Sequence, residues 1–459
     1  MDKIKSFGGG EKFPGPNTKK ILDMLKEYES RGEIYFSAYD IPPVIDEAQG
    51  VYLKDVDGNY YIDFTSGFAA LNAGHRHPKL IKAAVDQLEK VHHTAMLPVE
   101  ARAILAKKLC DIAPGKLKGN CRVHFDLSGT NAVEIAMKLA RAYTGRVNFI
   151  SYYGGYHGRS FGTLAVTSDA YLRDFYPIMP GGTQIPYPYC YRCIYGKEYP
   201  SCDFTCLKHL ELLFSNRKFG LADKKSGINS IAGLVIEPAQ GASGYIIPPD
   251  GYWPKVRKLC DKYGVLLIDD EIQMGWGRSG KTFCTELWDV TPDIMAFGKS
   301  ITGGVAPMAA VIAEKKVMDV FRPNQQSVTF GGTPVACAVG IAMLDVLKEE
   351  KLAENAREKG KYLLSGLKDL QNKHPLIGYV DGRGLMIGME FVKDRKTKEP
   401  ATDETRIIMK ESMKKGLVLN VTGYFGNRIN IVPPLIIEKE QINEALKILD
   451  EVLTFVEKK

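Results

Sequence analysis

The chain has 459 residues, of which 45% are hydrophobic and 25% are charged, a composition typical of a globular protein with two or three packed units. Its 61 basic and 54 acidic residues leave a net charge of +7 that is spread along the chain, and together with the lack of a nucleic-acid motif this argues against a nucleic-acid partner. No segment reaches the roughly 18 apolar residues of a membrane span, and the N-terminus lacks a signal-peptide run, so we expect no membrane partner and a cytoplasmic location.

The N-terminal segment is expected to be irregular before a hairpin begins. The first twenty or so residues are rich in Gly, Pro and Lys and predict a mobile arm. The sequence VYLKDVDGNYYIDFTSG, which starts at Val51, predicts two strands joined by a turn at Asp57 and Gly58. A helix is predicted after His77 and Pro78, where LIKAAVDQLEKV has apolar residues at helical spacing.

Five short apolar runs between helical patterns predict strands that are buried on both faces of a mostly parallel sheet, and thus an α/β domain. They span residues 147–151, 231–236, 265–268, 294–297 and 308–312. From about Gly340 the chain becomes helical and then alternates helices with the strands LMIGMEFV and INIVPPL, which predicts a smaller α+β domain. We therefore expect an N-terminal arm and hairpin at 1–75 that packs with the small domain, a large domain at 76–340, and the small domain at 341–459.

Four of the nine cysteines lie close together in YPYCYRCIYGKEYPSCDFTC, an insertion at about 188–208. Cys190, Cys193, Cys202 and Cys206 have the spacing C-x2-C-x8-C-x3-C, and two such pairs of thiolates can bind zinc tetrahedrally. The alternatives are two local disulfides or four reduced thiols in a surface insertion. The short loop between the pairs and the lack of flanking histidines favour these alternatives over zinc.

Polar residues follow several of the predicted strands, and in such sheets chemistry collects at the carboxyl ends of strands. Ser128-Gly129-Thr130-Asn131 opens an amphipathic helix whose free N–H groups and positive dipole end suit a phosphate, although simple helix capping also explains it. Three acids, Asp269 to Glu271, follow the run at 265–268. No His or Cys lies nearby to complete a transition-metal site, whereas a carboxylate that faces a pyridine nitrogen would keep that nitrogen protonated.

Lys299 follows the run at 294–297 and precedes a Gly-rich turn. Burial there penalises the ammonium group and lowers its pKa, which helps a lysine that forms a Schiff base. The segment Tyr156-His157-Gly158-Arg159 offers an aromatic side chain that can stack on a ring and a cation that can bind a carboxylate.

In combination these motifs resemble the class III aminotransferases of the fold-type I pyridoxal-phosphate enzymes, which include 4-aminobutyrate, ornithine and acetylornithine aminotransferases. The resemblance runs from about Pro42 to Leu453 and rests on SGT before a helix, YHGR, IEPAQGASG, DDEIQMGWGRSG, FGKS and TFGGTP, in the family's order. The four-cysteine insertion and the Lys-rich composition resemble archaeal members. The resemblance implies an α/β fold with a large domain around a mostly parallel sheet, pyridoxal 5'-phosphate as the cofactor, and a homodimer that can assemble further into a tetramer.

The resemblance also implies roles for the residues around the cofactor. Lys299 would carry the cofactor as a Schiff base and move the proton between the substrate Cα and the cofactor C4′, with Asp270 at the pyridinium nitrogen and Gln273 at the 3-oxygen. Thr329, in TFGGTP, would reach the phosphate of the neighbouring subunit, so the active sites would be shared in a dimer. The other implied cofactor contacts are the phosphate-binding Ser128, Gly129 and Thr130, the ring-stacking Tyr156, and His157.

On the substrate side, the resemblance implies that Arg159 binds the distal carboxylate of a 4-aminobutyrate-like donor and that Glu237 pairs with a mobile arginine. Phe68 falls where the family lines the pocket, although core packing explains it equally well. The family's arginine for the α-carboxylate, in N-x-[apolar]-R-x-x-P-P-L, is Asn430 here, and replacing a bidentate ion pair by one neutral hydrogen bond costs roughly 1–3 kcal/mol. Arg428 lies two residues earlier, on the same strand face. It either supplies the missing guanidinium or is a surface arginine, in which case Glu237 has lost its partner.

Two functions follow from the resemblance. The first is an aminotransferase that moves an amino group from an ω-amino acid or diamine-type donor to a 2-oxo acid such as 2-oxoglutarate, with Lys299, Asp270 and Glu237 as catalytic residues. The second is an amino-acid racemase or epimerase of the same family, in which the proton taken from Cα returns to Cα from the opposite face. The altered arginine weakens the requirement for two substrates and favours the second function somewhat.

Overall fold

The computed structural model describes residues 7–33, 41–169, 171–173, 181–216, 218, 221 and 230–458. Contacts divide the chain into two units. The smaller unit holds Met1–Pro78, Ser243–Tyr245 and Lys351–Lys459, and the larger unit holds Lys79–Ala242 and Ile246–Glu350. Among the described residues, no helix has both the length and the apolar character needed to cross a membrane.

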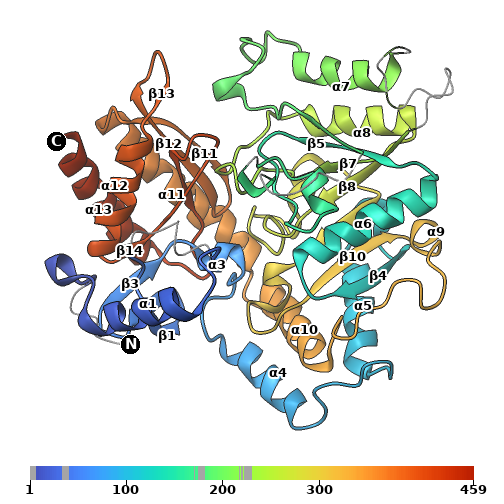
Figure 1. Cartoon of the computed structure of the whole chain (residues 1–459), viewed down its shortest axis with the longest axis horizontal. Helices are drawn as coiled ribbons and strands as arrows, with labels where there is room; N and C mark the ends of the chain where they lie inside the picture. The colour runs from blue at the N-terminus through green and yellow to red at the C-terminus, as the bar shows by residue number, and fades with distance from the viewer. Residues whose placement is uncertain are drawn as a thin grey trace. The chain divides into compact units, whose positions relative to one another are not determined.

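The larger unit is built on a seven-stranded sheet (Figure 1). Across the sheet, the strands are β4 (Cys121–Asp126), β10 (Ala309–Glu314), β9 (Ile294–Phe297), β8 (Leu266–Asp270), β7 (Ile231–Ile236), β5 (Asn148–Tyr152) and β6 (Gly182–Ile185). Only β10 is antiparallel to its neighbours, so the other strands of this sheet run in one direction. The predicted α/β class with a mostly parallel sheet is confirmed.

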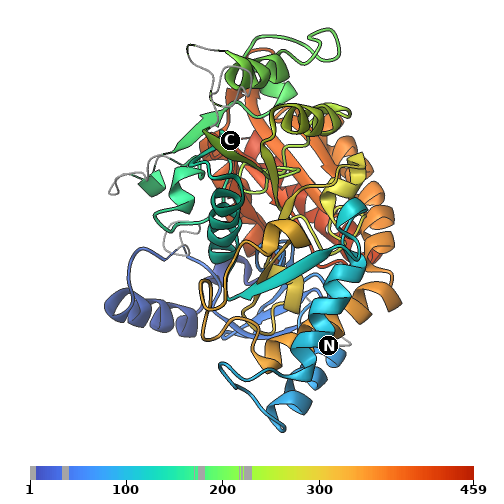
Figure 2. The same ribbon diagram turned by 90° about the vertical axis from the view of Figure 1, so that its right-hand side faces the viewer.

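Helices pack along this sheet, as Figures 1 and 2 show. The helix α6 (Gly129–Thr144) contacts β10, β9 and β7 and buries Val133, Ala136 and Ala140 in the main hydrophobic core. Its apolar residues recur at helical spacing, which is why one face of this helix is fully buried. The other helices of this part are α4 (Pro78–Leu88), α5 (Glu100–Ile112), α7 (Thr205–Ser215), α8 (Tyr252–Tyr263), α9 (Lys315–Met318) and α10 (Pro334–Glu349).

The smaller unit contains two sheets. One has the order β1 (Ile45–Gln49), β2 (Tyr52–Asp55), β3 (Tyr60–Asp63) and β14 (Leu417–Val418), so a C-terminal strand pairs with the N-terminal hairpin. The other has the order β11 (Ile377–Arg383), β12 (Met386–Asp394), β16 (Arg428–Ile431) and β15 (Asn420–Thr422), and β13 (Glu399–Pro400) pairs with β12. The helices among its described residues are α1 (Pro16–Tyr28), α3 (Ser66–Ala69), α11 (Leu352–Lys373), α12 (Thr402–Lys414) and α13 (Lys439–Glu457).

The N-terminal segment differs from the mobile arm that we predicted, because α1 begins at Pro16. Asp57, in the predicted hairpin turn, accepts hydrogen bonds from the backbone N–H groups of Asn17 and Thr18, each at 2.9 Å, and from the Thr18 hydroxyl at 2.6 Å. This carboxylate therefore caps a helix that lies about forty residues earlier in the sequence. Residues 1–6 of the predicted arm lie outside the described residues.

Other predicted elements are confirmed with small shifts. The strands predicted at 231–236 and 294–297 have those bounds in the structure, and the hairpin turns at Asp57 and Gly58 as expected. The helical stretch after Gly340 is two helices, since Lys351 adopts a left-handed φ of 51° between α10 and α11.

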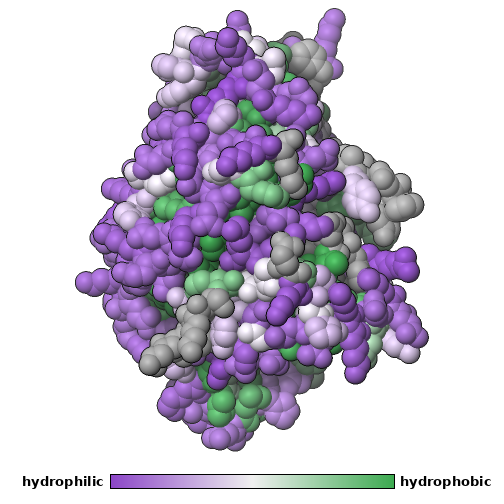
Figure 3. Space-filling model, turned by 90° about the vertical axis from the view of Figure 1, so that its left-hand side faces the viewer, coloured by the Kyte–Doolittle hydropathy of each residue, from purple (hydrophilic) through white to green (hydrophobic). Residues whose placement is uncertain are grey.

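The face of the molecule in Figure 3 is covered mainly by hydrophilic residues, with small separate hydrophobic patches between them.

Candidate active site

The candidate residues of the larger unit follow the ends of strands that share one direction. Ser128 comes after β4, Tyr156 after β5, and Glu237 directly after β7. Asp270 is the last residue of β8, and Lys299 lies two residues beyond β9, which is the neighbour of β8. Because the carboxyl ends of strands with one direction meet at the same edge of a sheet, the fold brings these five residues together.

The N-terminus of α6 provides backbone donors at this edge. The Ser128 side chain caps the helix by accepting from the Asn131 backbone N–H at 3.3 Å. Gly129 is needed at the next position, since a Cβ there would lie 2.9 Å from Ile272. Gly158 likewise makes room for Thr130, because a Cβ on Gly158 would lie 2.7 Å from the Thr130 Oγ1. The predicted residues therefore form a close-packed helix start whose dipole suits an anion.

Asp270 is held by His157 at the centre of the site. The His157 Nδ1 lies 2.7 Å from the Asp270 Oδ2, and the Ile272 backbone N–H donates to the Asp270 Oδ1 at 3.1 Å. Burial lowers the pKa of His157, but the hydrogen bond with Asp270 and its charge outweigh burial and leave this pKa raised. The structure thus places His157 as the partner of Asp270, which favours an imidazolium facing a carboxylate.

The two acids beside Asp270 point to the other side of β8, because successive residues of a strand alternate. Asp269 and Glu271 are fully buried and share Thr285, whose hydroxyl lies 3.2 Å from the Asp269 Oδ2 and 3.4 Å from the Glu271 Oε1. Burial and mutual repulsion raise the pKa of Asp269 well above its usual range, and burial raises the pKa of Glu271 to about 8. Asp270 is thus the acid of this segment that contacts His157.

Glu237 is buried and accepts two backbone hydrogen bonds. The Tyr156 N–H donates to the Oε1 at 2.8 Å, and the Gly241 N–H donates to the Oε2 at 2.7 Å. Burial raises the pKa of Glu237 to about 7, although the charge of His157 opposes this rise. Glu237 therefore lies close to the His157–Asp270 pair, with an ionisation that changes near neutral pH.

Lys299 occupies a strained position in the same cluster. Burial lowers the pKa of Lys299 to about 8, against the opposing charges of Asp270 and Glu237. The backbone of Lys299 has a left-handed φ of 47°, which is rare for a residue with a long side chain. Such strain clusters at functional sites, and a lysine with this pKa gives up a proton readily near neutral pH.

Three further predicted residues lie around this cluster. Tyr156 is 38% exposed. Arg159 is exposed too, and its guanidinium carbon lies 5.9 Å from the centre of the Tyr156 ring. Gln273 packs against Gly241, where a Cβ would lie 1.8 Å from the Gln273 Oε1. The aromatic ring and the cation that YHGR offers are thus neighbours in space.

Thr329, in the larger unit, is exposed. It lines a cavity of about 390 Å³ together with His93, Arg102 and His124. Met96 and Leu97, which also line this cavity, are 95% and 71% exposed. Polar and apolar side chains are thus both exposed around Thr329.

The predicted substrate residues of the smaller unit include two on β16. Arg428 is buried, so its interpretation as a surface arginine is wrong. Its Nη1 donates to the Glu390 Oε2 at 2.7 Å, and its Nε donates to the Gly244 carbonyl oxygen at 2.9 Å. Asn430 is also buried, and the Thr422 hydroxyl donates to its Oδ1 at 2.9 Å.

Glycines surround the Arg428 side chain and fix it in place. A Cβ on Gly244 would lie 2.4 Å from the Arg428 Nε, one on Gly388 would lie 2.3 Å from the Nη2, and one on Gly423 would lie 2.9 Å from the Cγ. This packing argues for a structural role of Arg428 and against the delivery of its guanidinium to a substrate. Phe68, the third predicted residue of this unit, is 39% exposed and has a left-handed φ of 58°.

The structure has no preformed coordination sphere for the zinc ion that the four-cysteine spacing suggested. Across the part of the chain that the structure describes, no group of three or more His, Cys, Asp or Glu side chains is arranged to hold a metal ion. None of the nine cysteines, all of which lie within the described residues, forms a disulfide. The four cysteines of the insertion nevertheless line one cavity.

Comparison with known proteins assigns the family. The family model "Aminotransferase class-III" matches residues 35–453. The chain belongs to the class III aminotransferase family. Its relatives include an alanine/serine racemase of Pyrococcus horikoshii, 35% identical over 96% of this chain and 91% of the relative, and an ornithine aminotransferase of Staphylococcus carnosus, 36% identical over 95% of this chain and 100% of the relative.

A solved structure supports both the fold and the cofactor. The ornithine aminotransferase of Toxoplasma gondii, described with pyridoxal phosphate at its active site, has a TM-score of 0.82 and 27% identity over 96% of this chain and 95% of its own. The expected fold-type I architecture, family and cofactor are therefore confirmed, and the chain is a pyridoxal-phosphate-dependent enzyme of the class III aminotransferases. The helix start that only Gly129 permits, the paired Asp270 and the buried Lys299 fit this cofactor.

Sequence reasoning missed several supporting residues. Thr285 holds the acid pair behind Asp270, and Glu390 pairs with Arg428. The alternation of side chains along a strand was a signal for the role of Thr285, since it places consecutive acids on opposite faces. The second depends on the register of β12 against β16, which sets Glu390 opposite Arg428 and has no local signal in the sequence.

Proposed function

We propose that this class III aminotransferase moves an amino group from an ω-amino acid or diamine-type donor, 4-aminobutyrate- or ornithine-like, to a 2-oxo acid such as 2-oxoglutarate. The observation that carries the proposal is the buried Lys299 beside Asp270 and Glu237, with a pKa lowered to about 8. A base of this kind is poised to remove a proton from a substrate carbon near neutral pH. The ornithine aminotransferase relative supports the same reaction class.

The residues of the site would divide the work among them. Pyridoxal phosphate supplies an electron sink that acidifies the substrate Cα. The N-terminus of α6, with Ser128, Gly129 and Thr130, would hold the phosphate. Asp270, kept in place by His157, would pair with the ring nitrogen and hold a proton there. Lys299 would move the proton at the substrate Cα.

The remaining residues would orient the cofactor and the substrate. Tyr156 would stack on the ring, and Gln273 would donate to the ring's 3-oxygen. Arg159, exposed beside Tyr156, would bind the distal carboxylate of an ω-amino acid through two parallel hydrogen bonds. Glu237 accepts hydrogen bonds from two backbone N–H groups and would therefore need no arginine partner. The space of that partner would be left for a substrate.

A racemase or epimerase is the second candidate, and the state of Arg428 and Asn430 favours it. The guanidinium of Arg428 is engaged by Glu390, and Asn430 offers no charge to an α-carboxylate. An aminotransferase must bind two different carboxylate substrates in turn, whereas a racemase returns the proton to a single substrate. The alanine/serine racemase relative supports this candidate as well.

A half-reaction screen tests the choice. Purified enzyme in D2O is given one amine or amino acid at a time, without any 2-oxo acid, and both the cofactor spectrum and the substrate are followed. An aminotransferase is expected to convert its cofactor to the pyridoxamine form stoichiometrically and then to need 2-oxoglutarate for turnover. A racemase would instead exchange the Cα hydrogen for deuterium and lose optical rotation over many turnovers without an oxo acid, and this result would reject the first proposal.

The surface around Thr329 supports a homodimer with shared active sites. Phe330 is 52% exposed and stacks on His93 with 4.6 Å between ring centres, next to the exposed Met96 and Leu97. Covering these side chains would remove a large apolar area from water. Sedimentation equilibrium at micromolar concentration is expected to give a dimer or a tetramer, and Thr329 would then lie against the neighbouring subunit's phosphate. A stable monomer would contradict the shared site.

A further inference from the structure

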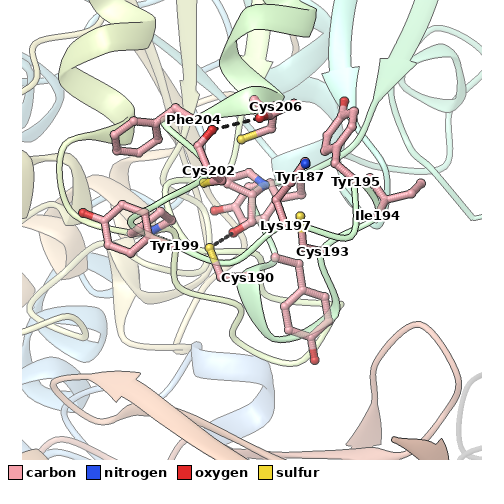
Figure 4. Close-up of a pocket in the computed structure, with 14 residues that line it drawn as sticks. Tyr187, Cys190, Cys193, Ile194, Tyr195, Lys197, Tyr199, Cys202, Phe204 and Cys206 are labelled. Carbon is pink, nitrogen blue, oxygen red and sulfur yellow. Dashed lines mark hydrogen bonds between the residues drawn. The ribbon is translucent and has the colours of Figure 1, made fainter. Parts of the chain in front are cut away.

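The insertion between β6 and α7 brings four cysteines around one small cavity (Figure 4). The cavity has a volume of about 30 Å³, which has room for one or two water-sized groups and not for an organic ligand. In the view of Figure 4, the sulfur atoms of Cys190 and Cys193 lie below those of Cys202 and Cys206. The rest of the lining is mainly aromatic and apolar, including Tyr187, Ile194, Tyr195, Tyr199 and Phe204.

The chain between the two cysteine pairs folds back on itself, so both pairs reach the same cavity. Cys190 begins a turn of 3-10 helix, and Cys193 ends it. The Gly196 N–H donates to the Cys193 carbonyl oxygen at 3.0 Å, and the Cys202 N–H donates to the Glu198 carbonyl oxygen at 2.9 Å. These two turns close the eight-residue spacer. A spacer that looked too short in the sequence is therefore long enough in the structure.

The second pair flanks a strained turn at the start of α7. Asp203 and Phe204 have left-handed φ values of 44° and 50°, which are rare for consecutive non-glycine residues. This turn places Cys206 in the first turn of α7. Strain of this kind persists where surrounding structure or a ligand holds it.

We propose that Cys190, Cys193, Cys202 and Cys206 bind one zinc ion, which fastens the insertion in place. Zinc prefers four thiolate ligands in a tetrahedron, and each cysteine pair supplies two of them from one tight turn. The side chains do not yet form a coordination sphere, so binding must draw the two pairs together around the cavity. The metal site goes beyond the proposed reaction and does not depend on it.

The charges around the cavity suit this ligand set. Four thiolates and one zinc ion carry a net charge of −2, and Lys197 lines the cavity. Lys255 lies nearby, with its Nζ 5.4 Å from the centre of the Phe204 ring.

The competing uses of these cysteines are less consistent with the structure. His209, the histidine nearest in sequence, has its Nδ1 2.6 Å from the Tyr195 hydroxyl and does not line the cavity. All four cysteines line one cavity, whereas two local disulfides would use them in separate pairs. Four cysteine ligands are instead a common ligand set of structural zinc sites.

Metal analysis of the pyridoxal-phosphate-loaded enzyme tests the proposal. The protein, purified without chelator from zinc-supplemented cells, is expected to contain about one zinc per chain. The double variant C193S/C206S, which removes one ligand from each pair, is expected to contain less than about a tenth of that amount. Replacement of the zinc by Co2+ is expected to give thiolate charge-transfer bands and the intense d–d bands of a tetrahedral site.

The control variant is C110S, which removes a half-buried cysteine outside the insertion. It should keep its zinc, and the cofactor content of all three proteins should be equal if the metal acts only on the insertion. Four reactive thiols with no zinc, or a mass that shows two disulfides, would overturn the proposal. Zinc that survives in C193S/C206S but disappears in C110S would overturn it as well.

Discussion

Replacement of Lys299 by alanine is expected to lower turnover by roughly 10³-fold or more, because it removes both the covalent attachment of the cofactor and the proton-transfer group. The visible absorbance of the bound cofactor should change at the same time. Borohydride reduction of the wild-type protein, followed by peptide mass spectrometry, should find the cofactor on the peptide that contains Lys299.

The matched control is Lys281→Ala, since Lys281 is an exposed lysine on the same stretch of chain and outside the site. This variant should keep wild-type turnover and the wild-type spectrum. A K299A protein that still carries the cofactor covalently, or a wild-type label on another lysine, would contradict the assignment of Lys299.

Breaking the buried ion pair between Arg428 and Glu390 is expected to have the largest effect on stability. Both side chains are 1% exposed, so R428M leaves a buried carboxylate without its cation and should cost about 3–5 kcal/mol of unfolding free energy. Urea unfolding, followed by fluorescence and by circular dichroism, measures this loss. The burial of Glu390 raises its pKa while Arg428 lowers it, so the variant should take up a proton at Glu390.

The double variant R428M/E390M separates a structural role from a substrate-binding role. Replacing both charges by apolar side chains of similar length should restore most of the stability, since no buried charge is then left unpaired. Turnover and KM should follow the stability and recover with it. If the double variant is stable but its KM for amino acids rises tenfold or more, Arg428 binds the substrate carboxylate after all.

Local patterns predicted the sheet of the larger unit well. The strands at 231–236 and 294–297 were predicted with their observed bounds because each is a short, fully buried apolar run between clear breaks. The site also followed from the sequence, since Asp270 and Lys299 stand at the ends of such runs. A parallel sheet brings strand ends together regardless of how far apart they lie in the chain.

Features that depend on distant contacts were not predictable in the same way. The helix α1 was missed because its cap, Asp57, lies about forty residues away, so nearby Gly and Pro residues dominated the local pattern. Arg428 was placed on the correct strand face, but its partner Glu390 comes from another strand whose register no local pattern encodes. His157 was expected near the cofactor, but its bond to Asp270 depends on the presence of β5 and β8 in one sheet.

The left-handed backbone at Lys299 lowers the stability of the fold at a residue that the reaction needs. A residue with a Cβ in this conformation loses roughly 1–2 kcal/mol relative to a relaxed backbone, and glycine would avoid that loss. A chain selected only for thermal endurance would therefore carry glycine at position 299. The lysine at this position lowers the stability of the protein and is retained because the reaction needs it.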